Sequence, residues 1–328
     1  MKHEAELNGL SRQVPSEPSE DVADEPITIS GFEIEILDAQ EEESADMVLS
    51  TDEFLRSEAW QNAPGALPLL IGKGVDGVPV VTDLARVLHL LIAGATGSGK
   101  SVFMNLCLFS LMLRHTSAEL KLVLVDTKAC EFNKYEDLPY LQFPVISNIQ
   151  DTLKVLQWLN KEMARRYELL TEAKCSDILT LNAQKPYSMP YIVLFIDDLA
   201  DVMLDVGALV ENHFNSLCAK GPAVGIHLVI STQRPDSRVL TDCVKANFST
   251  RIAFLVAGLQ DSLEILNKLG AEKLLGRGDM LYLRHDRITR HQGGFLEDGE
   301  IDQLLNDIRN AYGTAKFQQS LPELPAEG

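Results

Sequence analysis

The sequence predicts an α/β protein in which a mainly parallel sheet is flanked by helices and follows a small N-terminal α+β domain. From residue 88 onward, short apolar segments of strand length alternate with longer segments of helical periodicity. The candidate strands at 88–93 and 191–197 are mostly apolar, which is typical of strands buried on both faces of a parallel sheet. A chain of 328 residues, 45% of them hydrophobic, is long enough for one large domain and a smaller one.

The first 85 residues divide into two parts of different composition. Residues 1–30 are rich in Glu, Asp, Ser and Pro, and we expect them to form a disordered acidic leader. Residues 31–85 are expected to form the small domain. Within it, residues 31–37 alternate apolar and acidic side chains like a strand, and a short helix is expected to begin near residue 51. Two strand-like segments on either side of the pair Asp76-Gly77 predict a hairpin.

Residues 86–313 carry the alternating pattern and are expected to form the large domain, followed by a loose tail at 314–328. Apolar residues recur at spacings of three and four in its longest helical segment, and its last two strands are expected to pair antiparallel. The predicted strands are 88–93, 120–126, 191–197, 226–231, 251–256, 280–283 and 292–295, and the predicted helices are 101–115, 151–173, 208–219, part of 263–269, and 298–311.

Composition excludes several classes of protein. The net charge of −19 is concentrated in residues 1–60, which hold 17 acidic and 3 basic side chains, so the remainder carries only −5 and is not basic enough to indicate nucleic-acid binding. No apolar run approaches the ~18 residues that cross a bilayer, and the start has no secretory signal. The five cysteines are scattered, which favours a reduced chain over a disulfide or zinc framework. We therefore expect a cytoplasmic protein.

A phosphate-binding motif follows the first strand of the large domain and opens a helix, as the pattern G-x-x-x-x-G-K-[ST] requires. Its glycines let backbone N–H groups turn toward phosphate oxygens, and the helix adds its positive N-terminal end. Lys100 would reach the β- and γ-phosphates of ATP, and the Ser101 hydroxyl would bind Mg²⁺. The predicted nucleotide-binding residues are Gly94, Ala95, Thr96, Gly97, Ser98, Gly99, Lys100, Ser101 and Val102.

Polar residues at the ends of other strands are expected to complete this site. Asp197 would hold Mg²⁺ through water, and Asp198 would orient or deprotonate the attacking water, although paired carboxylates after a strand can also cap the next helix. Gln233 could sense the γ-phosphate or could be an ordinary loop amide. Asp126 and Lys128 also end a strand, where they line the same crevice or form a surface ion pair.

The chain resembles the motor of the FtsK/SpoIIIE family of DNA translocases over roughly residues 45–312. The stretches that carry the resemblance are PLLIGKGVDGVPVVTDLARVLHLLIAGATGSGKSV, VLVDTKACEFNKYEDLPYL, WLNKEMARRYELL, YIVLFIDDLADVM, GIHLVISTQRPDSRVLTDCVKANFSTRIAF and LGAEKLLGRGDMLY. The resemblance implies a RecA-like P-loop NTPase domain after a small α-domain. It also implies a homo-hexameric ring that threads double-stranded DNA, as in chromosome segregation, with ATP hydrolysed at subunit interfaces. The acidic leader could bind a protein partner.

The chain departs from the family pattern in several ways. Membrane-bound members have N-terminal transmembrane helices and many members end in a winged-helix domain, and the sequence predicts neither here. Asp198 stands where the family usually has Glu. Pro222 and Leu259 align with basic residues that family members offer to the neighbouring subunit's ATP, and Lys220 could substitute. Loss of such a donor can cost about 1,000-fold in rate, so nucleotide binding is better supported than rapid hydrolysis.

Contacts with DNA are expected from basic side chains in loops, because six subunits that each supply a few phosphate contacts add up, although any one of these residues taken alone is more often a solvated surface charge. No base-reading motif is present, so the contacts would be sequence-independent and would weaken steeply with salt. The candidates are Arg238, Lys245, Lys174 and Lys185, with a further cluster of Arg284, Arg287 and Arg290.

Three hypotheses follow for the function. The first is an ATP-driven translocase of double-stranded DNA. The second is a pseudo-motor or regulatory scaffold that binds ATP but hydrolyses it poorly, because of Asp198, Pro222 and Leu259. The third is a P-loop motor of the conjugative or secretion type, which would thread another polymer.

Overall fold

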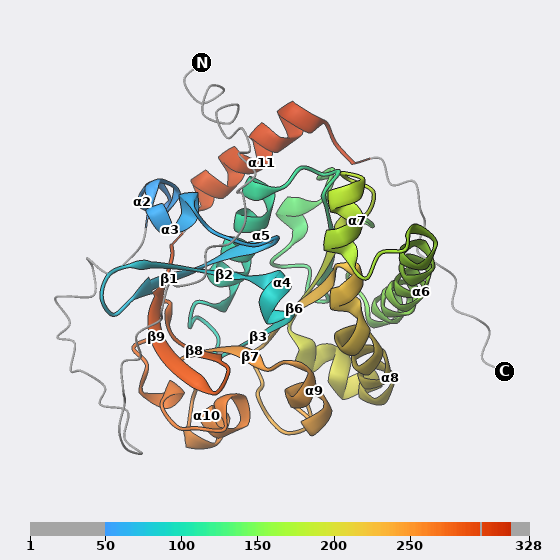
Figure 1. Cartoon of the computed structure of the whole chain (residues 1–328). Coiled ribbons are helices and arrows are strands. Elements are labelled where there is room, and N and C mark those ends of the chain that lie inside the picture. Colours follow the sequence, from blue (N-terminus) through green and yellow to red (C-terminus); the bar gives the residue numbers. More distant parts are fainter. Residues whose placement is uncertain (1–49, 296, 316–328) are drawn as a thin grey trace. The chain divides into compact units, whose positions relative to one another are not determined.

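The computed structural model describes residues 50–295 and 297–315, which belong to one compact unit of the chain spanning residues 39–328 (Figure 1). The predicted acidic leader, the predicted strand at 31–37 and most of the predicted tail lie outside the described residues. None of the helices described is long and apolar enough to cross a membrane.

Residues 50–295 contain one nine-stranded sheet, whose strands lie in the order β2-β1-β9-β8-β7-β3-β6-β5-β4. The strands are β1 (Pro68–Gly74), β2 (Pro79–Asp83), β3 (His89–Ala93), β4 (Leu120–Asp126), β5 (Tyr191–Asp197), β6 (Ile226–Thr232), β7 (Thr250–Phe254), β8 (Asp279–Arg284) and β9 (Arg287–Gly293). Strands β3 to β7 are parallel, whereas the other four pair antiparallel. This arrangement confirms the predicted fold class, a mixed sheet flanked by helices.

The parallel strands end at one edge of the sheet. Ala93 at the end of β3 lies opposite Thr232 of β6, and Asp126 at the end of β4 lies opposite Asp197 of β5. Parallel strands reach this edge with their carboxyl ends together, and ligands of open α/β sheets bind there. The loops that carry the predicted site residues are thereby gathered at one place.

Both predicted hairpins form, but the second differs in position. Strands β1 and β2 pair as expected, and β8 pairs with β9. The predicted strand at 292–295 was placed too late, because β9 begins at Arg287 directly after a turn in which His285 and Asp286 have positive φ. Arg287 is exposed and Arg290 is half-buried, and the first four residues of the strand contain a single apolar side chain, so the stretch looks like a loop when it is read for apolar residues alone.

The β1–β2 hairpin joins the same sheet through β9. Gly72 lies opposite Gly293, and a Cβ at Gly72 would lie only 2.1 Å from the carbonyl oxygen of Gln292. Only glycine permits so close an approach of two backbones. The predicted domain boundary at residue 85 stays a prediction, and the strands on its two sides are hydrogen-bonded in one sheet.

The α-helices among the described residues match most of the predicted ones. They are α2 (Thr51–Arg56), α3 (Glu58–Gln61), α4 (Leu84–Val87), α5 (Lys100–Arg114), α6 (Ile149–Ala173), α7 (Ile178–Gln184), α8 (Leu199–Lys220), α9 (Asp242–Asn247), α10 (Leu259–Leu266) and α11 (Asp298–Tyr312). Helix α8 starts well before the predicted residue 208. It consists of two helical segments that meet at a kink, where Val206 has non-helical backbone angles. Helix α10 also starts earlier than the predicted segment at 263–269.

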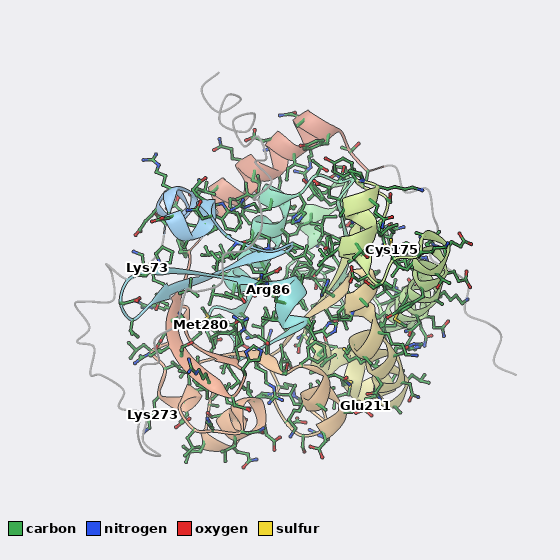
Figure 2. All side chains as sticks on the ribbon, in the orientation of Figure 1. Lys73, Arg86, Cys175, Glu211, Lys273 and Met280 are labelled. Atoms are coloured by element: carbon green, nitrogen blue, oxygen red, sulfur yellow. The ribbon has the colours of Figure 1, made fainter. Side chains whose placement is uncertain are left out.

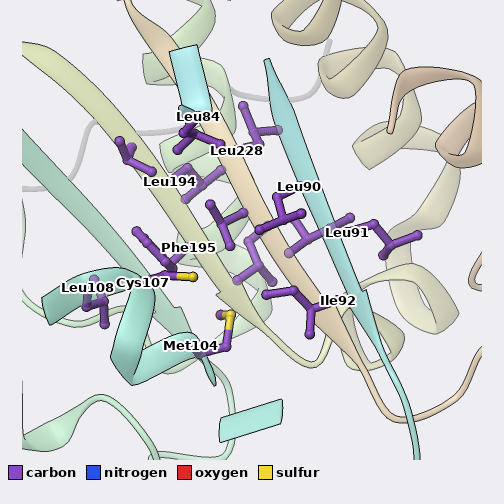
Figure 3. Close-up of a cluster of buried hydrophobic side chains, with 14 of the residues drawn as sticks. Leu84, Leu90, Leu91, Ile92, Met104, Cys107, Leu108, Leu194, Phe195 and Leu228 are labelled. Carbon is purple, nitrogen blue, oxygen red and sulfur yellow. The ribbon is translucent and has the colours of Figure 1, made fainter. Parts of the chain in front are cut away.

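The core lies between the sheet and its helices. Figure 3 shows Cys107 of α5 beside Phe195 of β5, and both residues are fully buried. Such burial contributes about 25 cal/mol per Å² of apolar surface, so this packing fixes α5, and with it the loop that precedes α5, against the sheet. All five cysteines are free in the structure, including the buried Cys107.

Helix α11 is attached to the loop that follows β4. The Arg309 guanidinium donates to Asp137 Oδ1 at 3.0 Å and to the carbonyl oxygen of Lys134 at 2.9 Å. The side chains of the remaining surface, including Cys175 after α6 and Lys273 in the turn after α10, are drawn in Figure 2.

Candidate nucleotide-binding site

The loop between β3 and α5 has the backbone that the phosphate motif requires. Gly94, Gly97 and Gly99 have φ of +157°, +76° and +120°, conformations that other residues rarely adopt. A Cβ at Gly99 would lie 2.9 Å from the backbone of Gly278, whereas a Cβ at Gly97 would meet nothing within 4 Å. Gly99 is therefore required both by its backbone angles and by close packing.

The residue that follows β7 and a distant loop hold the motif in place. The Ala95 amide donates to the carbonyl oxygen of Leu255 at 2.8 Å, and the Gly278 amide donates to that of Ser98 at 3.0 Å. The loop that carries Gly278 is itself fixed by a two-bond contact between Arg290 and Asp279, at 2.9 and 2.8 Å. The Ser98 hydroxyl is buried, and the described residues offer it no hydrogen-bond partner. The loop thus has a fixed backbone and an unused polar atom.

Lys100 begins α5 and lies among carboxylates. Its side chain donates to the carbonyl oxygen of Ala95 at 2.8 Å, and the residue is 5% exposed. Burial lowers the pKa of Lys100, and the negative charges of Asp197, Asp198 and Glu131 partly oppose that shift. The ammonium is held where phosphate oxygens would come within its reach.

Asp197 ends β5 at the same edge. The Ser231 hydroxyl donates to its carboxylate at 2.8 Å. Burial raises the pKa of Asp197 from 3.8 to about 6; the Ser231 hydrogen bond opposes this shift, and the charges of Glu131 and Asp126 add to it. A buried carboxylate surrounded by other carboxylates favours a cation beside it.

Asp198 is held differently. Its backbone is left-handed, with φ of +56°, and its carboxylate forms a short ion pair with Lys128. The same carboxylate accepts from the backbone N–H of Gln233 at 3.4 Å, and Asp198 makes no side-chain capping bond at the start of α8. The alternative that the two aspartates only cap the next helix therefore receives no support. Of the predicted pair, Asp198 is the one with a protein cation as its partner.

Gln233, after β6, is brought to the phosphate loop. Its side-chain oxygen accepts from the Thr96 hydroxyl at 2.8 Å. This contact joins the ends of β3 and β6 and places the Gln233 amide beside the residues that would surround a γ-phosphate.

Asp126 and Lys128 do not pair with each other. The fully buried Asp126 accepts hydrogen bonds from the backbone amides of Glu131 and Phe132 at 2.7 and 2.9 Å. Lys128 instead forms an ion pair with Asp198. The turn brings Glu131 to the phosphate loop, where it accepts from the Ser101 hydroxyl at 2.7 Å. Glu131 was not predicted from the sequence. The signal that could have found it is an acidic residue five positions after the end of β4.

The residues present fit a magnesium–triphosphate group. Mg²⁺ prefers oxygen ligands and usually keeps several waters, together with one or two carboxylates and substrate phosphates. The Ser101 hydroxyl and the Asp197 carboxylate offer such oxygens, and Ser98 Oγ and Asp126 Oδ1 are buried atoms without partners in the part of the chain that is described. No three His, Cys, Asp or Glu side chains among those residues are arranged to hold a metal ion. A cation here would therefore need the phosphate oxygens as ligands.

Comparison with known proteins decides the family. The model of the FtsK/SpoIIIE family matches residues 52–188. The chain is 45% identical over 262 residues to a DNA translocase FtsK of Treponema pallidum, covering 77% of this chain and 32% of that protein. It is 41% identical over 289 residues to the DNA translocase SftA of Bacillus subtilis, covering 86% and 30%. The chain belongs to the FtsK/SpoIIIE family. It spans about a third of the length of these relatives.

Solved structures agree on the fold of this FtsK/SpoIIIE chain. The pCW3 conjugation coupling protein TcpA, solved with ATPγS, has a TM-score of 0.68 and 25% identity, over 80% of this chain and 74% of that one. The cytoplasmic domain of the Type VII secretion ATPase EccC of Thermomonospora curvata has a TM-score of 0.67 and 21% identity, over 80% and 33%, and shows the fold alone. The fold is that of a P-loop ATPase motor domain.

The positions where this FtsK/SpoIIIE chain departs from the pattern lie at helix ends. Pro222 is in the 3-10 turn η3 (Gly221–Val224) that follows α8, and Lys220 directly before it is exposed. Leu259 is the first residue of α10 and is 56% exposed. Neither Pro222 nor Leu259 can donate a hydrogen bond from its side chain to phosphate.

The four predicted DNA contacts differ in how tightly the chain holds them. Lys245 pairs with Glu264 at 3.0 Å, and Arg238 pairs with Asp236 while its side chain stays 68% exposed. Lys174 and Lys185 are exposed residues at the ends of α6 and α7. Of the further cluster of arginines, Arg290 is bound to Asp279 and so supports the phosphate loop instead.

Proposed function

We propose that this chain is the ATPase motor of a DNA translocase, in which ATP hydrolysis drives movement along double-stranded DNA without reading its sequence. The observation that supports this most strongly is the phosphate loop, with Lys100 and Ser101 across from Asp197, in a member of the FtsK/SpoIIIE family. Its relatives in Treponema pallidum and Bacillus subtilis are named DNA translocases.

Each site residue has a defined task in this proposal. The backbone amides of Thr96, Gly97 and Gly99 and the Lys100 ammonium bind the phosphates, since the amides of Gly94, Ala95 and Ser98 donate to carbonyl oxygens of the chain. Ser101 and Asp197 would hold Mg²⁺, which when bound spreads the charge of the phosphates. Gln233 donates to the γ-phosphate from its amide nitrogen. Asp198 orients the attacking water, with Lys128 fixing its carboxylate.

The translocase would act as a ring, with ATP at the contacts between subunits. Six copies would each place a few basic side chains on the DNA backbone, of which Arg238, Lys174 and Lys185 are freer to do so than Lys245. Since each phosphate contact releases condensed counterions, binding is expected to weaken steeply with salt and to depend little on sequence.

ATP turnover with and without linear duplex DNA tests the proposal. The wild-type chain should hydrolyse ATP faster with DNA, and Lys100→Ala should lower turnover at least about 100-fold, because a positioned cation is lost from the transferring phosphate. Lys161→Ala, an exposed lysine on α6, is the matched control and should leave turnover unchanged. Turnover that is insensitive to both DNA and Lys100→Ala would reject the proposal.

The ATP-binding pseudo-motor is the second candidate, and the structure favours it at one point. Asp198 is shorter than the Glu usual in the family and is neutralised by Lys128. With the donor-free residues Pro222 and Leu259, this arrangement would slow hydrolysis. The double variant Asp198→Glu with Pro222→Arg should then raise turnover sharply, and unchanged turnover would count against impairment.

The conjugative or secretion-type motor is the third candidate. It is supported by the likeness to a conjugation coupling protein. A motor that moves protein should have its ATPase stimulated by a protein ligand and not by DNA, so the same turnover assay with added protein separates this candidate from the first.

A further inference from the structure

The Ser101 hydroxyl has a single proton, and it is directed at a carboxylate. Ser101 Oγ donates to Glu131 Oε1 at 2.7 Å, within a partly buried contact. A hydroxyl has one O–H donor and two acceptor lone pairs. With its proton directed at Glu131, Ser101 keeps its lone pairs for a cation on the other side. The orientation of this oxygen is therefore set by Glu131.

Glu131 is placed by a fixed turn. The fully buried carboxylate of Asp126 accepts from the amides of Glu131 and of Phe132, and the Phe132 side chain is 1% exposed. The Phe132 ring packs edge-on against Phe195 of β5, with centroids 6.5 Å apart. The end of β4, the turn and β5 thus form one rigid support, so the Glu131 backbone is held at the phosphate loop.

Glu131 also differs from its acidic neighbours in its partners. Asp198 is bound by the Lys128 ammonium, and Asp197 by the Ser231 hydroxyl. None of the ion pairs found among the described residues involves Glu131. The negative charge of Glu131 nevertheless acts to raise the pKa of Lys100 and that of Asp197. Within the part of the chain that is described, Glu131 is thus an acid of the site that forms no ion pair.

We propose that Glu131 is a positioning residue: it accepts the Ser101 proton and so presents a Ser101 lone pair to the Mg²⁺ that accompanies ATP. This inference rests on the proposed function, because it requires that the chain bind Mg·ATP. The sequence indicated Asp197 and Asp198 as the acids of the site, with Asp126 as a further candidate, and did not indicate Glu131. A carboxylate that orients a metal ligand through a hydrogen bond typically changes metal affinity about 10- to 100-fold when it is removed.

The inference is tested by titrating Mg²⁺ into the chain with a fluorescent ATP analogue, so that the readout is binding and not turnover. Glu131→Ala should weaken the Mg²⁺ dependence of binding about 10- to 100-fold and leave binding of the analogue in EDTA unchanged. Glu131→Gln keeps an oxygen that accepts from Ser101 and should lose less than Glu131→Ala. Glu136→Ala, an exposed acid in the same loop, is the control and should match wild type.

A double-mutant cycle separates action through Ser101 from a general charge effect. If Glu131 acts through that hydroxyl, Ser101→Ala with Glu131→Ala should weaken Mg²⁺ binding no more than Ser101→Ala alone. Losses that add, or a Glu131→Ala chain with wild-type Mg²⁺ dependence, would overturn the inference while leaving the proposed function intact. If the wild-type chain binds no ATP analogue, the proposed function itself fails. A melting temperature for each variant within about 4 °C of wild type shows that the fold is retained.

Discussion

Replacing Asp197 with Asn is expected to stabilise the fold in the absence of nucleotide. Burial raises the pKa of this carboxyl from 3.8 to about 6, although Ser231 donates a hydrogen bond to it. A pKa unit corresponds to about 1.4 kcal/mol, so holding this carboxylate ionised costs the fold about 3 kcal/mol at most. Asn has the same shape and can accept the Ser231 hydrogen bond with its amide oxygen, but it carries no charge.

The pH dependence gives this prediction its sign. A carboxyl with a raised pKa in the folded chain contributes its full stability below its unfolded value of 3.8 and loses it as pH rises through about 6. Asn does not titrate. The unfolding free energy of Asp197→Asn minus that of wild type should therefore grow from near zero at the acid end to about 1–3 kcal/mol above pH 6, and then stay constant.

Urea denaturation in EDTA between pH 4 and 8, followed by the fluorescence of the buried Trp60 and of Trp158, measures this difference. Asp205→Asn changes an exposed aspartate on α8, and it should stay within about 0.5 kcal/mol of wild type at every pH. A difference for Asp197→Asn that is flat across the range, or a variant less stable than wild type at pH 8, would refute the reasoning. The same variant should bind Mg·ATP more weakly, because a proposed oxygen ligand of Mg²⁺ is lost.

Three further predictions follow from the fold and the site. Gly99→Ala should abolish nucleotide binding and lower the melting temperature, because its Cβ would lie 2.9 Å from a facing backbone. Gly97→Ala, whose Cβ would meet no atom, should cost only about 1 kcal/mol of backbone strain. Binding calorimetry and thermal denaturation distinguish the two variants. Arg166→Ala, in which a 1% exposed guanidinium is lost, should destabilise the chain by about 3 kcal/mol or more, whereas Arg165→Ala should cost at most about 1 kcal/mol, and equal effects in urea would contradict this. Cys130, the exposed cysteine, should be the first thiol to react with a disulfide reagent in the native chain, as peptide mapping can show.

The strand-and-helix alternation was sufficient to predict the sheet and the phosphate loop, because these depend on local pattern and on glycine geometry. The strand order and the register were not readable, since they follow from which hydrophobic faces pair over long distances. Strand β9 was misplaced because its first four residues include Arg287 and Arg290 and are exposed or only half-buried, so they show no apolar pattern. The resemblance to FtsK/SpoIIIE motors predicted the family correctly.

The site was predicted less completely than the fold. Lys100, Ser101, Asp197 and Gln233 meet at one edge, as strand ends of a parallel sheet must, but their roles stay predictions. The partners of the acids could not be inferred. That Lys128 binds Asp198 depends on the path of a turn after β4, and this turn is set by hydrogen bonds to one buried carboxylate. The spacing of residues in the sequence does not predict such hydrogen bonds.

The hydrogen bond from Gly278 to Ser98 has a consequence for how the molecule is made. The phosphate motif leaves the ribosome before the backbone that packs against Gly99, which lies nearly 180 residues later and is held by Arg290. Contacts between residues so far apart in sequence form late in folding. A nascent chain released before β9 would contain the whole motif but lack the contacts that fix its backbone. The capacity to bind a triphosphate would therefore arise only when synthesis of the domain is almost complete.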